Sequence, residues 1–248
     1  MAYNREYITE FDRTSELAAF SGTSQCLKPH VSLTNDDGVI HFIREDYGGH
    51  SYVEIGGIKW ATMNVGATSV TDIGQYFAWA DRSGYTASQI GRDQGEKYFS
   101  WSSYPLSNDD GTVISKYNST DGKTVIEGYN DAAVRNWGGV WRMPTAAEYK
   151  ALENATTYSS TTNYEGTGVS GLVLTDKTDS SKKLFFPACG YVDGATFNNL
   201  GGGGIYWSSS VDTDDYQKAI CLGFAAGRAY MDDTHIRYNG GCVRAVAN

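Results

Sequence analysis

Turn-forming residues interrupt this chain so often that no long regular element fits between them. The sequence has 29 glycines among 248 residues, and pairs such as Asp121-Gly122 recur from Tyr52 onward. Glycine readily adopts the positive φ angles of tight turns, so each such pair favours a reversal of the chain. Leucine is sparse, and no heptad run of apolar residues occurs. The sequence therefore predicts turns, short strands and irregular loops, and it excludes an all-helical fold.

Short strands and two short helices are expected between the turns. One helix is predicted over residues 131–136, stopped by Gly138 and Gly139. The other begins at Pro144 and ends near residue 154, and in it Thr145 and Glu148 have the spacing of a capping box. Strands are predicted at residues 51–55, 58–63, 75–79, 113–117, 171–174, 184–186, 205–208, 219–224 and 242–246. This pattern predicts an α+β domain with short antiparallel strands and long ordered loops.

Residues 1–50 differ in texture from the rest and are predicted to form a separate leader. A helix through residues 17–20 could be capped at residues 12–15. Apolar runs at 31–33 and 39–42 flank a turn sequence at 35–38, which predicts a β-hairpin. We expect this leader to serve in attachment or oligomerisation, and residues 51–248 to form the ligand-binding domain.

The charge and hydropathy of the chain exclude several partners. The formal net charge of −9 would repel a phosphate backbone, and the 20 lysines and arginines are scattered; no nucleic acid is expected as a partner. No run of about 18 apolar residues occurs, so membrane insertion is not expected. The first ten residues are polar and do not resemble a signal peptide.

The cysteines and histidines show no metal-binding spacing. Cys26, Cys189, Cys221 and Cys242 lie far apart, and we interpret them as buried thiols, with a disulfide such as Cys189–Cys242 as the alternative. Acidic clusters at 108–110 and 212–215 are interpreted as turns and not as calcium loops. No metal and no cofactor are therefore predicted.

Residues 137–149 read Trp-Gly-Gly-Val-Trp-Arg-Met-Pro-Thr-Ala-Ala-Glu-Tyr. This stretch resembles a signature of bacterial C-type-lectin-fold proteins, and it is similar both to the Fibrobacter succinogenes major paralogous domain and to the sulfatase-modifying, formylglycine-generating proteins. The resemblance implies a C-type lectin fold. Further matches to the first family lie at residues 60–67, 76–79, 186–191, 204–210 and 241–246. The tryptophans in these stretches (Trp60, Trp79, Trp137, Trp141 and Trp207) are interpreted as core residues.

The C-terminal segment also resembles the variable proteins of diversity-generating retroelements, in which a Tyr-Trp-Ser-Ser strand opens the variable segment and a Gly-x-x-Val-Arg ending closes it. Here residues 206–209 and 240–244 carry those patterns. The resemblance implies a displayed, sequence-tolerant binding surface between them. In this segment Ile220, Leu222 and Phe224 alternate with the small residues Cys221, Gly223 and Ala225, so a strand would bury the first set and present the second.

Beyond the turn at residues 226–227, no periodic apolar face is evident until Val243, and residues 228–238 are interpreted as a contact loop. Tyrosine offers a large contact area at low entropic cost, and small polar residues offer adaptable hydrogen bonds. The alternative is an ordinary solvated hairpin. The predicted ligand-binding residues are Tyr216, Cys221, Gly223, Ala225, Arg228, Tyr230, Asp232, Asp233, Thr234, His235 and Tyr238.

A binding protein and not an enzyme is therefore expected, with a protein or glycan on a cell surface as its ligand. Its location would be extracellular, on a cell surface or on a virion, with no signal peptide in this chain, and an oligomer is possible. A fimbrial or surface adhesin subunit is one alternative. A formylglycine-generating enzyme is another, but Cys221 and Cys242 do not reproduce the close cysteine pair of that family, and no catalytic residues are predicted.

Overall fold

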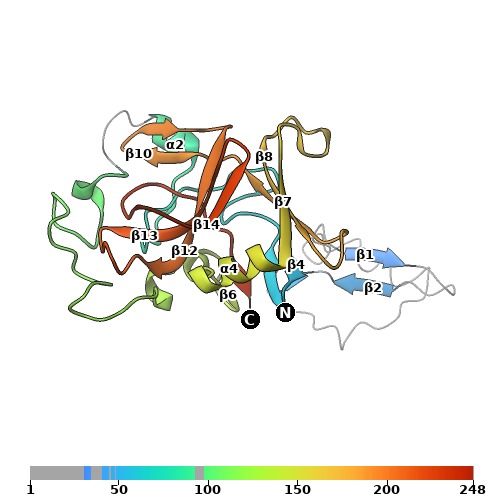
Figure 1. Cartoon of the computed structure of the whole chain (residues 1–248), viewed down its shortest axis with the longest axis horizontal. Coiled ribbons are helices and arrows are strands. Elements are labelled where there is room, and N and C mark those ends of the chain that lie inside the picture. The colour runs from blue at the N-terminus through green and yellow to red at the C-terminus, as the bar shows by residue number, and fades with distance from the viewer. Residues whose placement is uncertain (1–30, 35–40, 45, 48, 93–97, 248) are drawn as a thin grey trace, which may run out of the picture. The chain divides into compact units, whose positions relative to one another are not determined.

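The computed structural model describes residues 31–34, 41–44, 46–47, 49–92 and 98–247 (Figure 1). Its contacts divide the chain into two units, Met1–Tyr52 and Val53–Asn248. The sequence predicts the division between residues 50 and 51. The helix expected at residues 17–20, the turn at 35–38, Cys26 and His30 all lie outside the described residues.

The first unit contains a β-hairpin. Strand β1 (Val31–Thr34) pairs antiparallel with β2 (His41–Arg44), with Val31 opposite Arg44. Strand β3 (Asp46–Tyr47) then pairs with the beginning of β4 (His50–Ile55). The predicted pairing of the strands on either side of residues 35–38 is confirmed.

The second unit is mostly antiparallel β-structure with a few short helices, as the α+β prediction requires. One three-stranded sheet consists of β7 (Thr156–Thr161), β8 (Gly171–Asp176) and β9 (Lys183–Pro187). Another consists of β12 (Gly203–Val211), β13 (Lys218–Ala225) and β14 (Arg228–Ile236). The smaller pieces are the hairpin β10 (Tyr191–Asp193) with β11 (Thr196–Asn198), and the neighbours β5 (Ile58–Ala61), β15 (Val246–Ala247) and β6 (Trp141–Arg142).

Some predicted strands do not form as such. Residues 75–79 and 113–117 contain only isolated bridges, among them Tyr76 opposite Tyr85 and Ile114 opposite Ser107. Apolar composition suggested strands there, but residues 76–79 are buried as irregular chain, whereas residues 113–116 are exposed or half-buried. The positive φ angles of Ala80 and Tyr117 break the extended backbone. Residues 242–246 give only the short strand β15.

Both predicted helices form, and hydrogen bonds at their ends explain why. Helix α3 (Ala132–Trp137) begins at Asp131, whose carboxylate accepts from the amides of Ala133 and Val134, and it ends at Gly138 with φ 66°. Helix α4 (Ala146–Ala155) begins with the predicted capping box. A further short helix, α2 (Ala87–Arg92), was not predicted.

Residues 137–149, which carry the family resemblance, form a network of hydrogen bonds around the start of α4. The Arg142 guanidinium donates to both oxygens of Glu148, at 2.6 and 2.8 Å. Glu148 in turn accepts from the Thr145 amide at 2.7 Å, and the Asp131 carboxylate accepts from the Met143 amide at 2.8 Å. The charged groups of the motif are thus engaged in holding the start of α4, whereas the Tyr149 hydroxyl is buried without a hydrogen-bond partner among the described residues.

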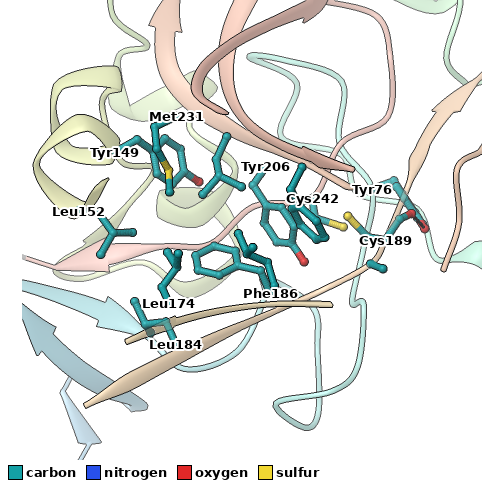
Figure 2. Close-up of a cluster of buried hydrophobic side chains, with 14 of the residues drawn as sticks. Tyr76, Tyr149, Leu152, Leu174, Leu184, Phe186, Cys189, Tyr206, Met231 and Cys242 are labelled. Carbon is teal, nitrogen blue, oxygen red and sulfur yellow. Dashed lines mark hydrogen bonds between the residues drawn. The ribbon is translucent and has the colours of Figure 1, made fainter. Parts of the chain in front are cut away.

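The core lies between the two three-stranded sheets and α4 (Figure 2). Figure 2 shows Phe186 of β9 between Leu174 of β8 and Tyr206 of β12, with Met231 of β14 beside Tyr149 of α4. The Tyr206 hydroxyl donates to the Pro187 carbonyl at 2.7 Å, so this buried tyrosine is satisfied. Four of the five tryptophans predicted as core are buried (Trp60, Trp79, Trp141 and Trp207), whereas Trp137 is only half-buried.

Two fully buried arginines hold the C-terminal segment in place. Arg237 donates to the Tyr104 hydroxyl at 2.9 Å and to the carbonyls of Lys116, Tyr117 and Tyr216, and its guanidinium lies 4.5 Å from the Trp79 ring. The second is Arg244. Burial lowers the pKa of the guanidinium group of each arginine.

Arg244 donates twice to the Asn64 side chain and also to the carbonyls of Ala61, Thr62 and Phe185. Each arginine thus connects segments far apart in sequence through carbonyl groups that burial would otherwise leave unpaired.

Within the part of the chain that the structure describes, no helix combines the length and apolar character needed to cross a membrane.

Candidate ligand-binding cavity

The C-terminal segment that the sequence predicts as a contact loop is a strand. After β13 the chain reverses at Ala226 and Gly227, with φ angles of 49° and 78°, and returns as β14 with Arg228 opposite Ala225. Two positive φ angles are what a two-residue hairpin turn requires. The prediction of a loop rested on the absence of apolar periodicity. That absence is compatible with a strand here, because β14 lies at the edge of its sheet and most of its side chains need no apolar partner.

The two faces of β13 follow the prediction only in part. Leu222 and Phe224 belong to the core, and Ala225 on the opposite face is exposed, but Gly223 on that face is buried. Cys221 also lies on that opposite face, but it is fully buried, so the prediction that it is presented to a ligand is wrong. Neighbouring strands flank it, because Trp207 of β12 and Asp233 of β14 pair with Cys221 on either side. Ile220, expected in the core, is only half-buried.

A β-bulge brings distant residues of β14 onto one face. Gly223 pairs with Tyr230, but Cys221 pairs with Asp233, so Met231 and Asp232 together oppose Leu222. A bulge of this kind adds a residue to one strand and changes the direction of the side chains around it. As a result Tyr230 and Asp233, three positions apart, share the face of Gly223, while Met231 enters the core.

That shared face forms one wall of a small cavity of about 130 Å³. Strands β12, β13 and β14 contribute to it, as do the start of β10 and the turn before β12. Five of the predicted ligand-binding residues meet here: Gly223, Ala225, Tyr230, Asp233 and His235. The other lining residues are Gly190, Tyr191, Asn199, Gly204, Ile205 and Phe224.

Gly223 lines the cavity, and the carboxylate of Asp233 lies over it. A Cβ atom at Gly223 would collide with the Asp233 carboxylate oxygen Oδ2. The other oxygen, Oδ1, accepts from the Thr234 amide at 2.9 Å. Oδ2 lies 3.9 Å from Nε2 of His235, which is beyond hydrogen-bond distance.

The His235 imidazole is held in its neutral form. Burial lowers its pKa, and the nearby Asp233 carboxylate and a hydrogen bond with Asn239 oppose that effect only in part. At neutral pH the imidazole therefore brings no positive charge to Asp233. Among the described residues, no lysine or arginine forms an ion pair with Asp233.

Aromatic residues contribute to the lining of the cavity. The Tyr191 ring lies 4.8 Å from the His235 imidazole between ring centres, at a tilt of 57°. Tyr230 is 49% exposed, and Leu200, which follows the lining residue Asn199, is 50% exposed. Large exposed apolar groups beside a cavity are a common mark of a contact surface.

The remaining predicted residues lie elsewhere. Tyr238 packs edge-on against Trp101 with 5.0 Å between ring centres, beside a separate cleft lined by Asp193 and Thr196. Tyr216 borders another cleft, near Gly111 and Ser119. Arg228 and Asp232 are exposed on β14, and Thr234 is half-buried opposite Ile220.

Six lining residues were not among the predicted ligand-binding residues. Gly190, Tyr191, Gly204 and Ile205 were recognised only as parts of motifs, Phe224 was expected in the core, and Asn199 was not singled out. Asn199 adopts a φ of 54°, and its side chain lies where Cβ atoms of Gly202 and Gly203 would be. The run of asparagines and glycines at 198–204 was the available signal, because such a run indicates unusual backbone beside the strand that follows it.

Cys189, Cys221 and Cys242 are free thiols, as the preferred interpretation holds. Figure 2 shows the sulfur atoms of Cys189 and Cys242 facing each other. Burial raises the pKa of the Cys221 and Cys242 thiols, and a thiol held protonated is a poor nucleophile and a poor metal ligand.

The acidic clusters act as turns. Asp110 accepts from the Thr112 amide, Asp212 accepts from the Asp214 amide, and Asp215 pairs with Lys218 at 3.0 Å. In the described ranges no three histidine, cysteine or acidic side chains are grouped so that they could hold a metal ion.

Comparisons of the chain with protein-family models, with curated proteins and with solved structures gave no match. The C-type lectin fold and the family resemblances therefore stay predictions.

Proposed function

We propose that this chain is a displayed binding protein and that the solvent-facing side of β13 and β14, with the cavity beneath Tyr230, is its ligand-binding surface. The observation that carries the proposal is the meeting of Gly223, Ala225, Tyr230, Asp233 and His235 around one cavity. A rigid aromatic residue next to small and polar groups is the composition typical of protein-binding surfaces.

The way in which β14 is held supports the same proposal. Met231 is buried in the core and Arg237 is anchored by buried hydrogen bonds, while Arg228, Tyr230 and Asp232 are exposed between or before them. Packing fixes the strand through the first pair and places few demands on the other three. We propose a C-type lectin fold for the domain, and we propose that these exposed positions are diversified by a retroelement.

The ligand is proposed to be a protein or a glycan on a cell surface. The chain would meet this ligand outside the cell, displayed on a cell surface or on a virion. The cavity in this surface is partly apolar and measures about 130 Å³. Sites for drug-sized molecules measure about 300–1,000 Å³, so the surface suits contact with another macromolecule better than capture of such a molecule.

Binding to intact cells tests the proposal. Fluorescently labelled protein would be incubated with a panel of bacterial cells, and its retention measured by flow cytometry. The test variant carries Arg228→Ala, Tyr230→Ala and Asp232→Ala, which together leave the net charge unchanged. The matched control carries Thr157→Ala, Tyr158→Ala and Ser160→Ala on β7, where Tyr158 is 47% exposed. We expect the first variant to lose retention and the control to keep it. Equal retention of the two variants, or no retention of the unaltered chain on any cell, would contradict the proposal.

Diversification has a separate test in the genome that encodes the chain. A reverse transcriptase gene nearby, with a near-copy of the 3′ end of the coding sequence that differs at adenines, is the expected arrangement. The absence of both would refute diversification and leave the binding surface as proposed.

A further inference from the structure

The cavity beneath Tyr230 has a chemistry that narrows the choice of ligand. Its volume of about 130 Å³ is well below the several hundred cubic ångströms of a small-molecule site, so it has room for a single side chain or functional group. Its lining includes Tyr191, Tyr230 and three glycines, and the Asp233 carboxylate lies over one of them, Gly223.

The Asp233 carboxylate can accept further hydrogen bonds. Oδ1 accepts a hydrogen bond from the Thr234 amide, whereas Oδ2 has no hydrogen-bond donor among the described residues. A carboxylate can accept several hydrogen bonds, and a positive charge nearby is its most favourable partner. In a chain with a net charge of −9, a cationic ligand also gains from the overall field.

We propose that this cavity binds the side chain of an arginine or lysine presented by a protein ligand, with the charged end at the Asp233 carboxylate and the aliphatic stem against Tyr191 and Tyr230. Long basic side chains combine an apolar stem with a charged end, and the cavity offers surfaces for both. The aromatic walls add an attraction between the cation and the rings. The inference rests on the proposed function, because it takes the cavity to be part of the ligand-binding surface.

Short blocked peptides test the chemistry without a known ligand. The probes are acetyl-Gly-Arg-Gly-amide, the lysine equivalent, and acetyl-Gly-citrulline-Gly-amide, in which a neutral group of nearly the same shape replaces the guanidinium. Each is titrated into the isotope-labelled full chain, and the backbone amide resonances of Gly223, Tyr230 and His235 are followed by NMR. We expect saturable, weak binding of both basic peptides at these amides, and binding of the citrulline peptide to be weaker by about tenfold, or 1.4 kcal/mol.

Two charge variants make the test specific. Asp233→Asn keeps the shape of the side chain and removes its charge, and it is expected to weaken binding of the arginine peptide by about tenfold. Asp214→Asn removes the same charge from an exposed carboxylate in the turn before β13, away from the cavity, and is expected to leave binding unchanged. Gly223→Ala, which displaces the Asp233 carboxylate, is a third variant and is expected to behave like Asp233→Asn. The NMR spectra themselves show whether each variant is folded.

Three results would overturn the inference: equal binding of the arginine and citrulline peptides, equal effects of Asp214→Asn and Asp233→Asn, or no saturable shifts at the cavity amides. The proposed function fails on a different result, namely cell retention that does not depend on Arg228, Tyr230 and Asp232. If retention depends on those residues while the peptides do not bind, the surface is right and its ligand chemistry is wrong.

Discussion

The two three-stranded sheets of the second unit look alike in topology but differ in what their outer strands do. Strand β7 pairs with β8 in unbroken register from Thr156 to Thr161, whereas β14 carries a bulge opposite Leu222. Each outer strand exposes one tyrosine to almost the same extent, Tyr158 at 47% and Tyr230 at 49%. Tyr230 lines the cavity, whereas Tyr158 lines none of the cavities described above.

The difference shows that an exposed edge strand is not by itself a binding surface. Each sheet has a glycine facing its neighbours. A Cβ atom at Gly171 of β8 would meet the Phe186 carbonyl oxygen and the Phe185 ring, whereas one at Gly223 of β13 would meet the Asp233 side chain. The first glycine allows two strands to pack closely. The second, together with the bulge, leaves room for a polar group and a small cavity.

Substituting the two glycines separates these roles and should give the largest effect. Gly171→Ala forces a contact with backbone that cannot move away, so we expect it to lower the free energy of unfolding by about 3 kcal/mol and the Tm by about 8 °C. Gly223→Ala displaces only a side chain, so we expect a loss below about 1 kcal/mol. Urea unfolding of both variants checks the order, and equal or reversed losses would contradict it.

Removing the bulge should give a smaller effect. Deleting Asp232 leaves one residue, Met231, opposite Leu222 and keeps every other pair of β13 and β14, so we expect a loss of about 1 kcal/mol. Deleting Ser159 from β7 is the control. That strand has no extra residue to give up, so the deletion shifts its register and should cost more. A larger loss for the Asp232 deletion in urea unfolding would show that the bulge is required for folding.

The smallest expected effect is a dependence of the free energy of unfolding on pH that comes from His235 of β14 and has no counterpart in β7. Burial lowers the pKa of His235 below its ordinary value of about 6.5. The unfolded chain therefore binds a proton more readily, and stability should be complete above pH 6.5 and fall as the pH drops below it. His235→Gln should remove this part of the slope, while a Tyr158→Ala variant should keep it. The free energy of unfolding at pH 7.5 and 5.5 measures the difference, and an unchanged slope in His235→Gln would contradict the assignment.

Local signals in the sequence were sufficient for much of the fold. The capping box at Thr145 and Glu148 and the glycines after residue 137 predicted helices α4 and α3, because those signals depend on neighbouring residues alone. The hairpin pairing of β1 and β2 followed from the residues between the strands in the same way. Residues 75–79 failed as a strand because the buried contacts that hold them come from distant segments, such as the carbonyls of Arg237 and Gly241.

The candidate site was predictable in composition but not in arrangement. Alternation along β13 placed Gly223 and Ala225 on the outer face, and the same rule wrongly placed Cys221 in solvent, because alternation gives a face and not what covers it. The bulge at Met231 and Asp232 could not be predicted, since register depends on the pairing of two strands. Tyr191 reaches the cavity from a different hairpin altogether, which no local pattern reveals.

The claim that β14 and its cavity form the binding surface is tested most directly by the affinity of two tyrosine variants for the ligand, once cell retention has identified it. Tyr230→Ala and Tyr158→Ala remove the same side chain at nearly equal exposure. A central tyrosine of an interface contributes about 2 kcal/mol, so we predict an increase in Kd of roughly thirtyfold for Tyr230→Ala and no change for Tyr158→Ala. Equal Kd values for the two variants would contradict the account.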